Sequence, residues 1–321
     1  MVGSRRVVAL AALFAALLFV PASSATDTDT TGLQHVLVVL GTSGPVPFSV
    51  ADAQAAGRAT AEFFHTASFG RLTLDFDVTP WLSAFTRDPG CSARDQLTLD
   101  QLLLPERVAV QRAGYVPSDY PRVVYVVANS HCGFYGMTIG HETMLTRAPS
   151  VELLAHELGH SFGLGHSNTA RCPHDCTMTS PGDPFDPMGT GEQLIDLNVY
   201  EKVLLGWLPA QPRVSHSGVY TLVPASGPGN AAHALVVPAE DGEWWIEYRA
   251  HPFRGLLVRY VDFDLATAPF APSPILMINP TGKHRDWIAV GETYRAPEGL
   301  AVRLTRAQQA QARVRIRLVG A

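Results

Sequence analysis

The chain of 321 residues has few lysines, few cysteines and, after residue 20, no long hydrophobic run. Lys202 and Lys283 are its only lysines, so arginine carries almost all of the positive charge. The sequence has no basic stripe, no run of arginines and no aromatic platform, which argues against a nucleic-acid-binding protein. No segment after residue 20 is long and apolar enough to span a bilayer, and no internal repeat is evident.

The first 25 residues have the organisation of a secretory signal peptide. Arg5 and Arg6 precede an apolar run over residues 7–20, and a small-residue cleavage sequence ends at Ala25. The alternative, a membrane anchor, would need a run of about 20 apolar residues. We therefore expect cleavage after Ala25, a secreted protein and no membrane attachment. Loss of the two arginines changes the formal charge from −5 to −7, so the mature chain is mildly acidic.

Four cysteines in a secreted chain predict two disulfides, for which three pairings are possible. We favour Cys172–Cys176 within one loop and Cys91–Cys132 between two loops. The alternative is a second metal site formed by Cys172, His174 and Cys176. The three residues between its cysteines match zinc knuckles poorly, so we favour the disulfide.

One eleven-residue run, His-Glu-Leu-Gly-His-Ser-Phe-Gly-Leu-Gly-His, carries the strongest functional signal. It places His156 and His160 four residues apart, Glu157 beside the first of them, and His166 at its end. A catalytic zinc ion takes three protein ligands, often histidine nitrogens, and keeps one position open. The run therefore predicts one catalytic Zn²⁺ bound by the three histidines.

The residues around this run predict a helix. Pro149 and Ser150 are typical of a helix start, and apolar side chains recur at helical spacing over residues 151–162. The first two histidines of the run fall on the opposite face. Gly163 can end the helix in a left-handed conformation, which would turn the chain so that the third histidine returns to the metal.

The motif H-E-x-x-H-x-x-G-x-x-H is matched at every fixed position, and Met188 follows 22 residues after His166. In these features the sequence resembles the metzincin metalloproteases, in which a methionine-bearing turn lies below the zinc. Within that clan, residues 182–189 and 202–208 look like the corresponding runs of gametolysin-like peptidases. The resemblance covers roughly residues 34–208 and is weaker over the C-terminal third.

The resemblance implies a secreted zinc endopeptidase that hydrolyses peptide bonds of extracellular proteins. Zinc would polarise the scissile carbonyl and lower the pKa of its bound water toward about 7. Glu157 would take the proton from that water and pass it to the leaving amine. Met188 would form an apolar floor beneath the imidazoles without binding the metal. Astacin- and serralysin-like enzymes carry a tyrosine where this chain has Thr190, so the transition-state helper stays unassigned.

Two further expectations concern the chain around Met188. Asp183 and Asp186 could hold calcium or could orient the backbone of the methionine turn, and we favour the second role. The wall of the substrate pocket is expected after Met188, around Thr190–Leu197.

The apolar pattern of residues 26–208 predicts an α/β (α+β) domain with a twisted sheet, as the resemblance also implies. The strand at 142–145 is expected at the edge of that sheet, where substrate could add as a further strand. The expected strands are 35–40, 71–78, 122–127 and 142–145, and the expected helices are 51–67, 95–113, the zinc helix and 194–205.

After residue 208 the chain changes to short β-rich pieces, which predict a small antiparallel β-sandwich over residues 209–321. The expected strands are 218–223, 234–237, 244–249, 256–261, 275–278, 302–304 and 312–319. Two roles fit this domain: bracing the protease, or binding a surface glycan or substrate.

Two other functions compete with an endopeptidase. The first is a surface-binding or adhesin-like protein with a catalytically silent metzincin scaffold. The intact Glu157 and the three histidine ligands argue against it. The second is a zinc hydrolase that acts on a bond other than a peptide bond.

Overall fold

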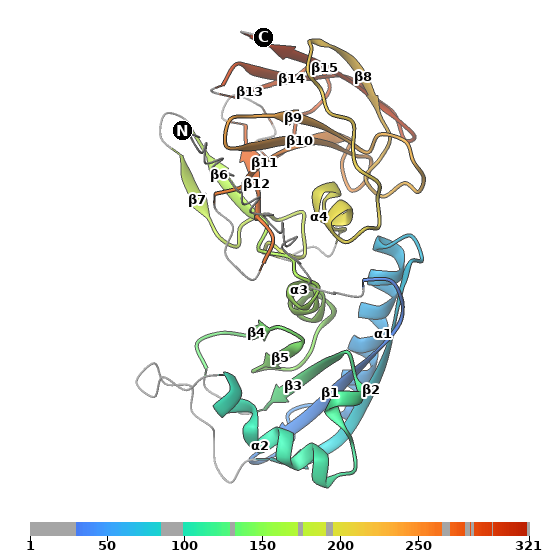
Figure 1. The fold of residues 1–321 in the computed structure, drawn as a ribbon, viewed down its shortest axis with the longest axis vertical. Coiled ribbons are helices and arrows are strands. Elements are labelled where there is room, and N and C mark those ends of the chain that lie inside the picture. The colour runs from blue at the N-terminus through green and yellow to red at the C-terminus, as the bar shows by residue number, and fades with distance from the viewer. Residues whose placement is uncertain are drawn as a thin grey trace, which may run out of the picture.

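The computed structural model describes residues 30–84, 99–128, 132–172, 176–190, 195–264, 270–279, 283, 286–296 and 298–319. The expected signal peptide lies outside these residues. Within the described part of the chain, no helix is long and apolar enough to cross a membrane. The described residues form a mixed α/β structure with three sheets, and α3 lies between the first sheet and the other two (Figure 1).

The first sheet has the order β2-β1-β3-β5-β4 in the described residues. Its strands are β1 (Gly32–Thr42), β2 (Leu72–Ser83), β3 (Arg122–Val127), β4 (Gly136–Ile139) and β5 (Glu142–Leu145). The first three and β5 run parallel, and β4 runs antiparallel to β5. β1 and β3 are buried along most of their length, as central parallel strands covered on both faces should be.

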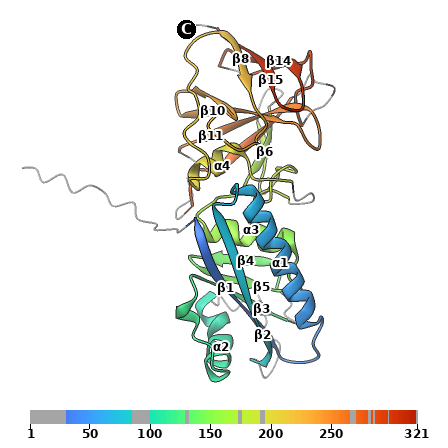
Figure 2. The same cartoon turned by 90° about the vertical axis from the view of Figure 1, so that its right-hand side faces the viewer.

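Two helices cover opposite faces of this sheet, α1 (Val50–Ala67) and α2 (Leu99–Arg112) (Figure 2). Side chains of β1 alternate between them because successive residues of a strand point to opposite faces. Val36 and Val38 join the core under α1 and α3, whereas Leu37 and Val39 join the core under α2.

The edge of this sheet differs from the expectation. β5 has the predicted bounds, but it pairs with β3 on one side and β4 on the other. β4 therefore holds the edge. Four residues beginning with a glycine, Gly136-Met137-Thr138-Ile139, are too short and too weakly patterned to stand out as a strand in the sequence.

The second sheet has the order β7-β6-β12-β11-β10-β9 in the described residues. Its strands are β6 (Asn168–Arg171), β7 (Thr177–Thr179), β9 (Ala234–Pro238), β10 (Gly242–Arg249), β11 (Gly255–Asp262) and β12 (Pro274–Ile278). β12 runs parallel to β6. The expected sheet was antiparallel and formed after residue 208, whereas β6 and β7 precede that residue. Both are too short and polar to show a strand period.

The third sheet consists of β13 (Thr293–Arg295), β14 (Leu300–Ala307), β15 (Ala312–Leu318) and β8 (Gly218–Leu222), all antiparallel. Its buried side chains share one core with the second sheet, for example Val302 and Ile316 with Ile246 and Val258. The division into domains 26–208 and 209–321 stays a proposal.

Two elements join the halves of the chain. α4 (Val199–Leu204) packs against the second sheet, where Val199 N donates to Glu247 Oε2 at 2.8 Å. Trp207, which is fully buried, packs against Phe64 of α1, and its indole N–H donates to Thr30 O at 2.8 Å. The segment from α4 to Trp207 therefore contacts the second sheet through α4 and α1 through Trp207.

The predicted Cys172–Cys176 disulfide is confirmed, and it closes the loop between β6 and β7. Because both sulfurs are bonded to each other, the alternative metal site of Cys172, His174 and Cys176 is wrong. Cys132 is also disulfide-bonded. Cys91 lies outside the described residues, so its pairing with Cys132 stays a prediction.

Candidate metal centre

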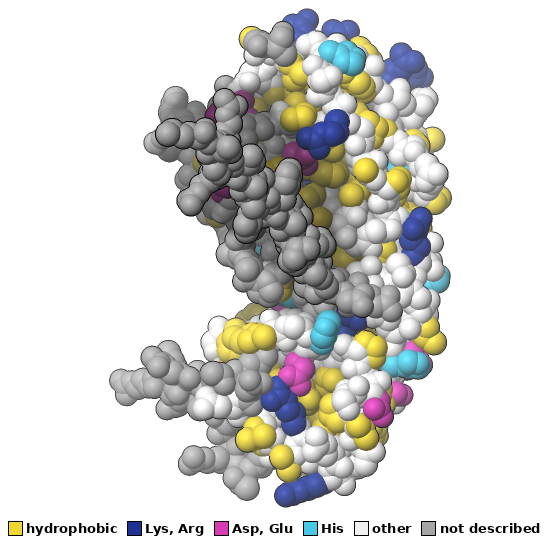
Figure 3. Space-filling model, in the orientation of Figure 1, with side chains coloured by type: hydrophobic (Ala, Val, Ile, Leu, Met, Phe, Trp, Pro, Cys, Tyr) yellow, Lys and Arg dark blue, Asp and Glu magenta, His cyan; other side chains and the backbone are white. Residues whose placement is uncertain are grey.

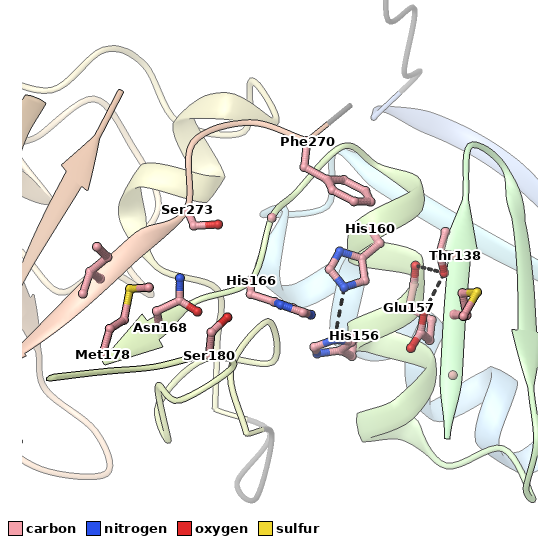
Figure 4. A pocket seen from close by; sticks show the side chains of 14 residues that line it. Thr138, His156, Glu157, His160, His166, Asn168, Met178, Ser180, Phe270 and Ser273 are labelled. Carbon is pink, nitrogen blue, oxygen red and sulfur yellow. Dashed lines mark hydrogen bonds between the residues drawn. The ribbon is translucent and has the colours of Figure 1, made fainter. Parts of the chain in front are cut away.

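The helix that carries the first two histidines, α3 (Val151–Ser161), begins where the sequence predicts. The Ser150 side chain caps it by accepting a hydrogen bond from Leu153 N at 3.3 Å. Leu154 and Leu158 are buried against the first sheet. His156 and His160 lie on the other side of the helix and line a cleft (Figure 4).

The chain turns back after the helix at Gly163, whose φ of 89° lies in the left-handed region that glycine adopts without strain. Gly163 N donates to His160 O at 2.9 Å, and Leu164 N donates to Gly159 O at 3.0 Å. This turn brings His166 toward the two helical histidines, as predicted.

The three histidines converge. One ligand nitrogen from each lies within 4.8 Å of the others, and among the described residues this is the group that could hold a metal ion. The Nε2 atoms of His156 and His160 are 3.2 Å apart (Figure 4).

The tautomers of the helical histidines show that this group fits a cation. Nδ1–H of His156 donates to Pro187 O at 2.7 Å, and Nδ1–H of His160 donates to Leu164 O at 2.8 Å. A neutral imidazole carries one proton, so both Nε2 atoms present lone pairs. Two lone pairs that face each other at 3.2 Å repel unless a cation lies between them. In metal sites, a ligating histidine usually donates its other ring N–H to a carbonyl or carboxylate, as both of these histidines do.

Burial keeps these rings neutral. It lowers the pKa of His156 to about 4 and that of His160 to about 3, and it also lowers the pKa of His166. Metal ligands must be deprotonated, so the site is ready for a metal ion at neutral pH without losing protons.

Glu157 lies beside the histidines and is 4% exposed. Burial raises its pKa to about 7, although a hydrogen bond from Thr138 acts in the opposite direction. The Thr138 hydroxyl, on β4, lies 2.6 Å from Glu157 Oε2 and 2.9 Å from the Thr143 hydroxyl of β5. A Cβ at Gly136 would overlap the Glu157 carboxylate. Nothing in the sequence indicated a role for Thr138 or Gly136, because β4 was not predicted.

Met188 lies beneath the helix, fully buried, with its sulfur so close to Gly159 that a Cβ there would overlap it. Its carbonyl accepts a hydrogen bond from Ser167 N at 2.8 Å. The preceding Pro187 carbonyl is the partner of His156. The methionine turn therefore contacts the helix and supports one ligand, and the structure brings it to the histidines.

Both aspartates before Met188 are fully buried and bonded to the turn. Asp183 Oδ1 accepts from Phe185 N at 2.9 Å, and Asp186 Oδ1 accepts from Met188 N at 2.9 Å. Arg259 of β11 donates to Asp183 Oδ2 from Nη2 at 2.7 Å. These contacts correspond to the favoured role, orientation of the turn. Nothing in the sequence indicated this role for Arg259, an arginine inside an apolar strand.

The histidines and Glu157 line a cleft of about 560 Å³. One wall is β4. The opposite wall contains Asn168 of β6 and three residues that precede or enter β12, Phe270, Ser273 and Ile275 (Figure 4). The Phe270 ring lies 5.0 Å from the His160 ring, and Ala271 N donates to Gly163 O at 3.1 Å. Sequence reasoning missed this wall, because its contact spans more than a hundred residues.

A second hollow of about 550 Å³ lies on the other side of His156 and Glu157. Tyr135, Leu153 and Thr190 are among the residues that line it. From the sequence, we expected the wall of the substrate pocket around Thr190–Leu197. Thr190 is at this hollow, and residues 191–194 lie outside the described residues.

No protein-family model and no curated protein matches the chain. Among solved structures, it is similar to the structure of a chaperone–substrate complex at 15% identity and a TM-score of 0.33, which covers 54% of this chain and 30% of that one. It is also similar to metalloproteinase-II from Bacteroides fragilis at 14% identity and a TM-score of 0.33, which covers 57% of this chain and 55% of that one. The chain thus spans about half or less of each. At this TM-score neither similarity carries a functional argument, so the function must be inferred from the site.

Proposed function

We propose that the protein is a secreted zinc-dependent endopeptidase of the metzincin type, similar to the gametolysin-like peptidases. His156, His160 and His166 bind the metal, and Glu157 is the general base. One observation carries the proposal: two neutral imidazoles face each other through their Nε2 lone pairs, beside a buried carboxylate in an open cleft.

The donor set fits zinc. Three imidazole nitrogens leave a fourth tetrahedral position open, which is the usual arrangement of a catalytic zinc site. When bound, Zn²⁺ would polarise the scissile carbonyl and acidify the attacking water.

The chain's own groups do the proton transfer and hold the substrate. Thr138 holds one oxygen of Glu157, so the other can accept a proton from water and deliver it to the leaving amine. An extended peptide would pair with the open edge of β4, because β4 is bonded to β5 on its other side. Asn168 and Phe270 would face that peptide from the opposite wall.

Secretion is part of the proposal. The Cys172–Cys176 disulfide suits an oxidising compartment, and the signal-like sequence over residues 1–25 would direct export. The substrates would then be extracellular proteins.

The test compares casein cleavage by the secreted wild-type protein and by Glu157→Gln, with metal content measured for both. General bases contribute about 10²–10⁴-fold to rate, so the variant should lose at least about a hundredfold in kcat while it keeps one zinc per chain. Glu62→Gln, the same change on the exposed surface of α1, is the matched control and should keep full activity. A chelator should abolish wild-type cleavage, and added zinc should restore it.

Cleavage by Glu157→Gln at the wild-type rate would refute the assigned base. A wild-type protein that binds zinc but cleaves neither casein nor a peptide library would favour the silent-scaffold alternative. Absence of bound metal in the wild-type protein would refute the zinc site itself.

A further inference from the structure

The outward face of the third sheet carries six exposed arginines, Arg295 on β13, Arg303 and Arg306 on β14, and Arg313, Arg315 and Arg317 on β15. We refer to this surface as the arginine face. The alternation that exposes them buries the intervening apolar side chains in the shared core. Lys and Arg side chains stand along the top of Figure 3, at the end of the molecule where Figure 1 draws β8, β14 and β15.

The strand register places like charges together. Arg303 lies directly opposite Arg315, and Ala301 lies between Arg295 on one neighbouring strand and Arg317 on the other. Like charges directly opposite each other destabilise a sheet. The arrangement therefore costs stability in the free protein.

In the part of the chain that the structure describes, no acidic side chain pairs with this charge. Within the described residues none of the six guanidinium groups makes an ion pair, whereas Arg213 and Arg107 elsewhere pair with Glu243 and Glu142. The exposed positions of the adjoining strand β8 are Val219 and Thr221. This is notable in a chain whose 29 acidic residues outnumber its 24 basic ones.

The face also contains a formed cavity. Four of its arginines, Arg295, Arg303, Arg315 and Arg317, surround a hollow of about 90 Å³ with Thr293 and Ala301 as the other lining residues. Ala301 is 5% exposed, and its small side chain leaves the space between the guanidinium groups open. The hollow has room for about three water molecules, which is the size range of one sulfate, phosphate or carboxylate group.

We propose that the arginine face binds a linear acidic polysaccharide, one of whose anionic groups enters this hollow. Planar guanidinium groups bind carboxylates and oxyanions through paired hydrogen bonds. Arg313, Arg315 and Arg317 recur about every 7 Å along β15, which suits a polymer with repeated charges. Glycan binding was one of the roles that fit the sequence of this region, and the arginine face adds that the glycan is acidic.

Two other polyanions fit the face less well. Single-stranded nucleic acid is bound by aromatic platforms, but Tyr294 is buried and Tyr220 points partly into the core. Peripheral binding to an anionic membrane combines basic residues with apolar side chains that insert, and Val219 is the one exposed large apolar side chain in the described strands of this sheet.

The test measures binding of the full-length protein to immobilised dextran sulfate, with neutral dextran as the reference surface. Arg303→Gln/Arg315→Gln should bind about 20-fold more weakly, since each basic side chain near an anionic surface contributes roughly a fivefold factor. Its affinity should also depend less steeply on salt. The matched control, Arg58→Gln/Arg112→Gln, removes the same charge from exposed positions on α1 and α2 and should change affinity less than about twofold.

Thermal unfolding without ligand provides an independent readout. If the arginines serve binding, Arg303→Gln/Arg315→Gln should unfold at the same or a higher temperature than wild type, because it removes a repulsion. A destabilised variant, or equal binding by both double variants, would overturn the proposal. Stronger binding to anionic vesicles or to single-stranded DNA than to dextran sulfate would also overturn it. Neither measurement depends on protease activity. A failure of this proposal can therefore be distinguished from a failure of the proposed function.

Discussion

The two walls of the cleft differ in how the chain builds them. The wall that contains α3 takes its three histidines and Glu157 from eleven consecutive residues. The opposite wall joins Asn168 to Phe270 and Ser273, which are about a hundred residues apart. The candidate metal-binding residues are therefore encoded locally, whereas the shape of the cleft depends on the packing of distant segments.

The two walls are linked below the metal site. Arg259 of β11 contacts Asp183, whose carboxylate also accepts from Ser167 beside His166. The second sheet thus supports the methionine turn through a buried ion pair.

The largest expected effect, on unfolding free energy, comes from removing the ion pair between Arg259 and Asp183. Arg259→Met would leave Asp183 as a buried charge without its cationic partner, whereas Glu247 would keep its ion pair with Arg249. Loss of one partner of a buried pair typically costs about 3–5 kcal/mol of unfolding free energy. Denaturant unfolding measures this loss, and metal content should fall with it. Arg213→Met is the control, because its ion pair with Glu243 is at the surface, where such pairs contribute about 0–1 kcal/mol. Equal losses in the two variants would show that the link does not support the site.

A smaller effect, on kcat, is expected from a change at Thr138 of β4, on the same wall as α3. Thr138→Val keeps the shape of the side chain but removes the hydrogen bond to Glu157. Hydrogen bonds to charged groups contribute about 1.5–3 kcal/mol, so kcat should fall by roughly 10- to 100-fold. KM and zinc content should stay unchanged, and Thr138→Ser should recover most of the rate. A valine variant with the wild-type kcat would show that Thr138 does not position the base.

The sequence predicted α3 and its histidines, although not β4 of the same wall, because the signals of the helix are short-range. Ser150 caps the helix, the apolar stripe fixes which face is buried, and Gly163 turns the chain. Each of these depends on residues within one or two helical turns. The structure accordingly places the predicted histidines together.

The other wall escaped prediction for physical reasons. β6 and β7 have four and three residues, too few for a period of two to be visible. The parallel pairing of β6 with β12 depends on tertiary packing, and nothing near Asn168 indicates that Ile275 lies beside it. Arg259 was missed because a buried arginine in an apolar strand is explained only by its partner, Asp183.

The smallest expected effect is on this second wall. Phe270→Ala removes the ring that lies 5.0 Å from His160 and opens the cleft on that side. Aromatic contacts contribute about 0.5–1.5 kcal/mol, so KM for peptide substrates should rise by roughly 2- to 10-fold. Zinc content and kcat should stay unchanged, because the ring binds neither the metal nor Glu157. Phe263→Ala, at an exposed phenylalanine outside the cleft, should leave KM unchanged. If Phe270→Ala lowered kcat and left KM unchanged, this wall would act on the chemistry and not on substrate binding, and the contrast between the two walls would fail.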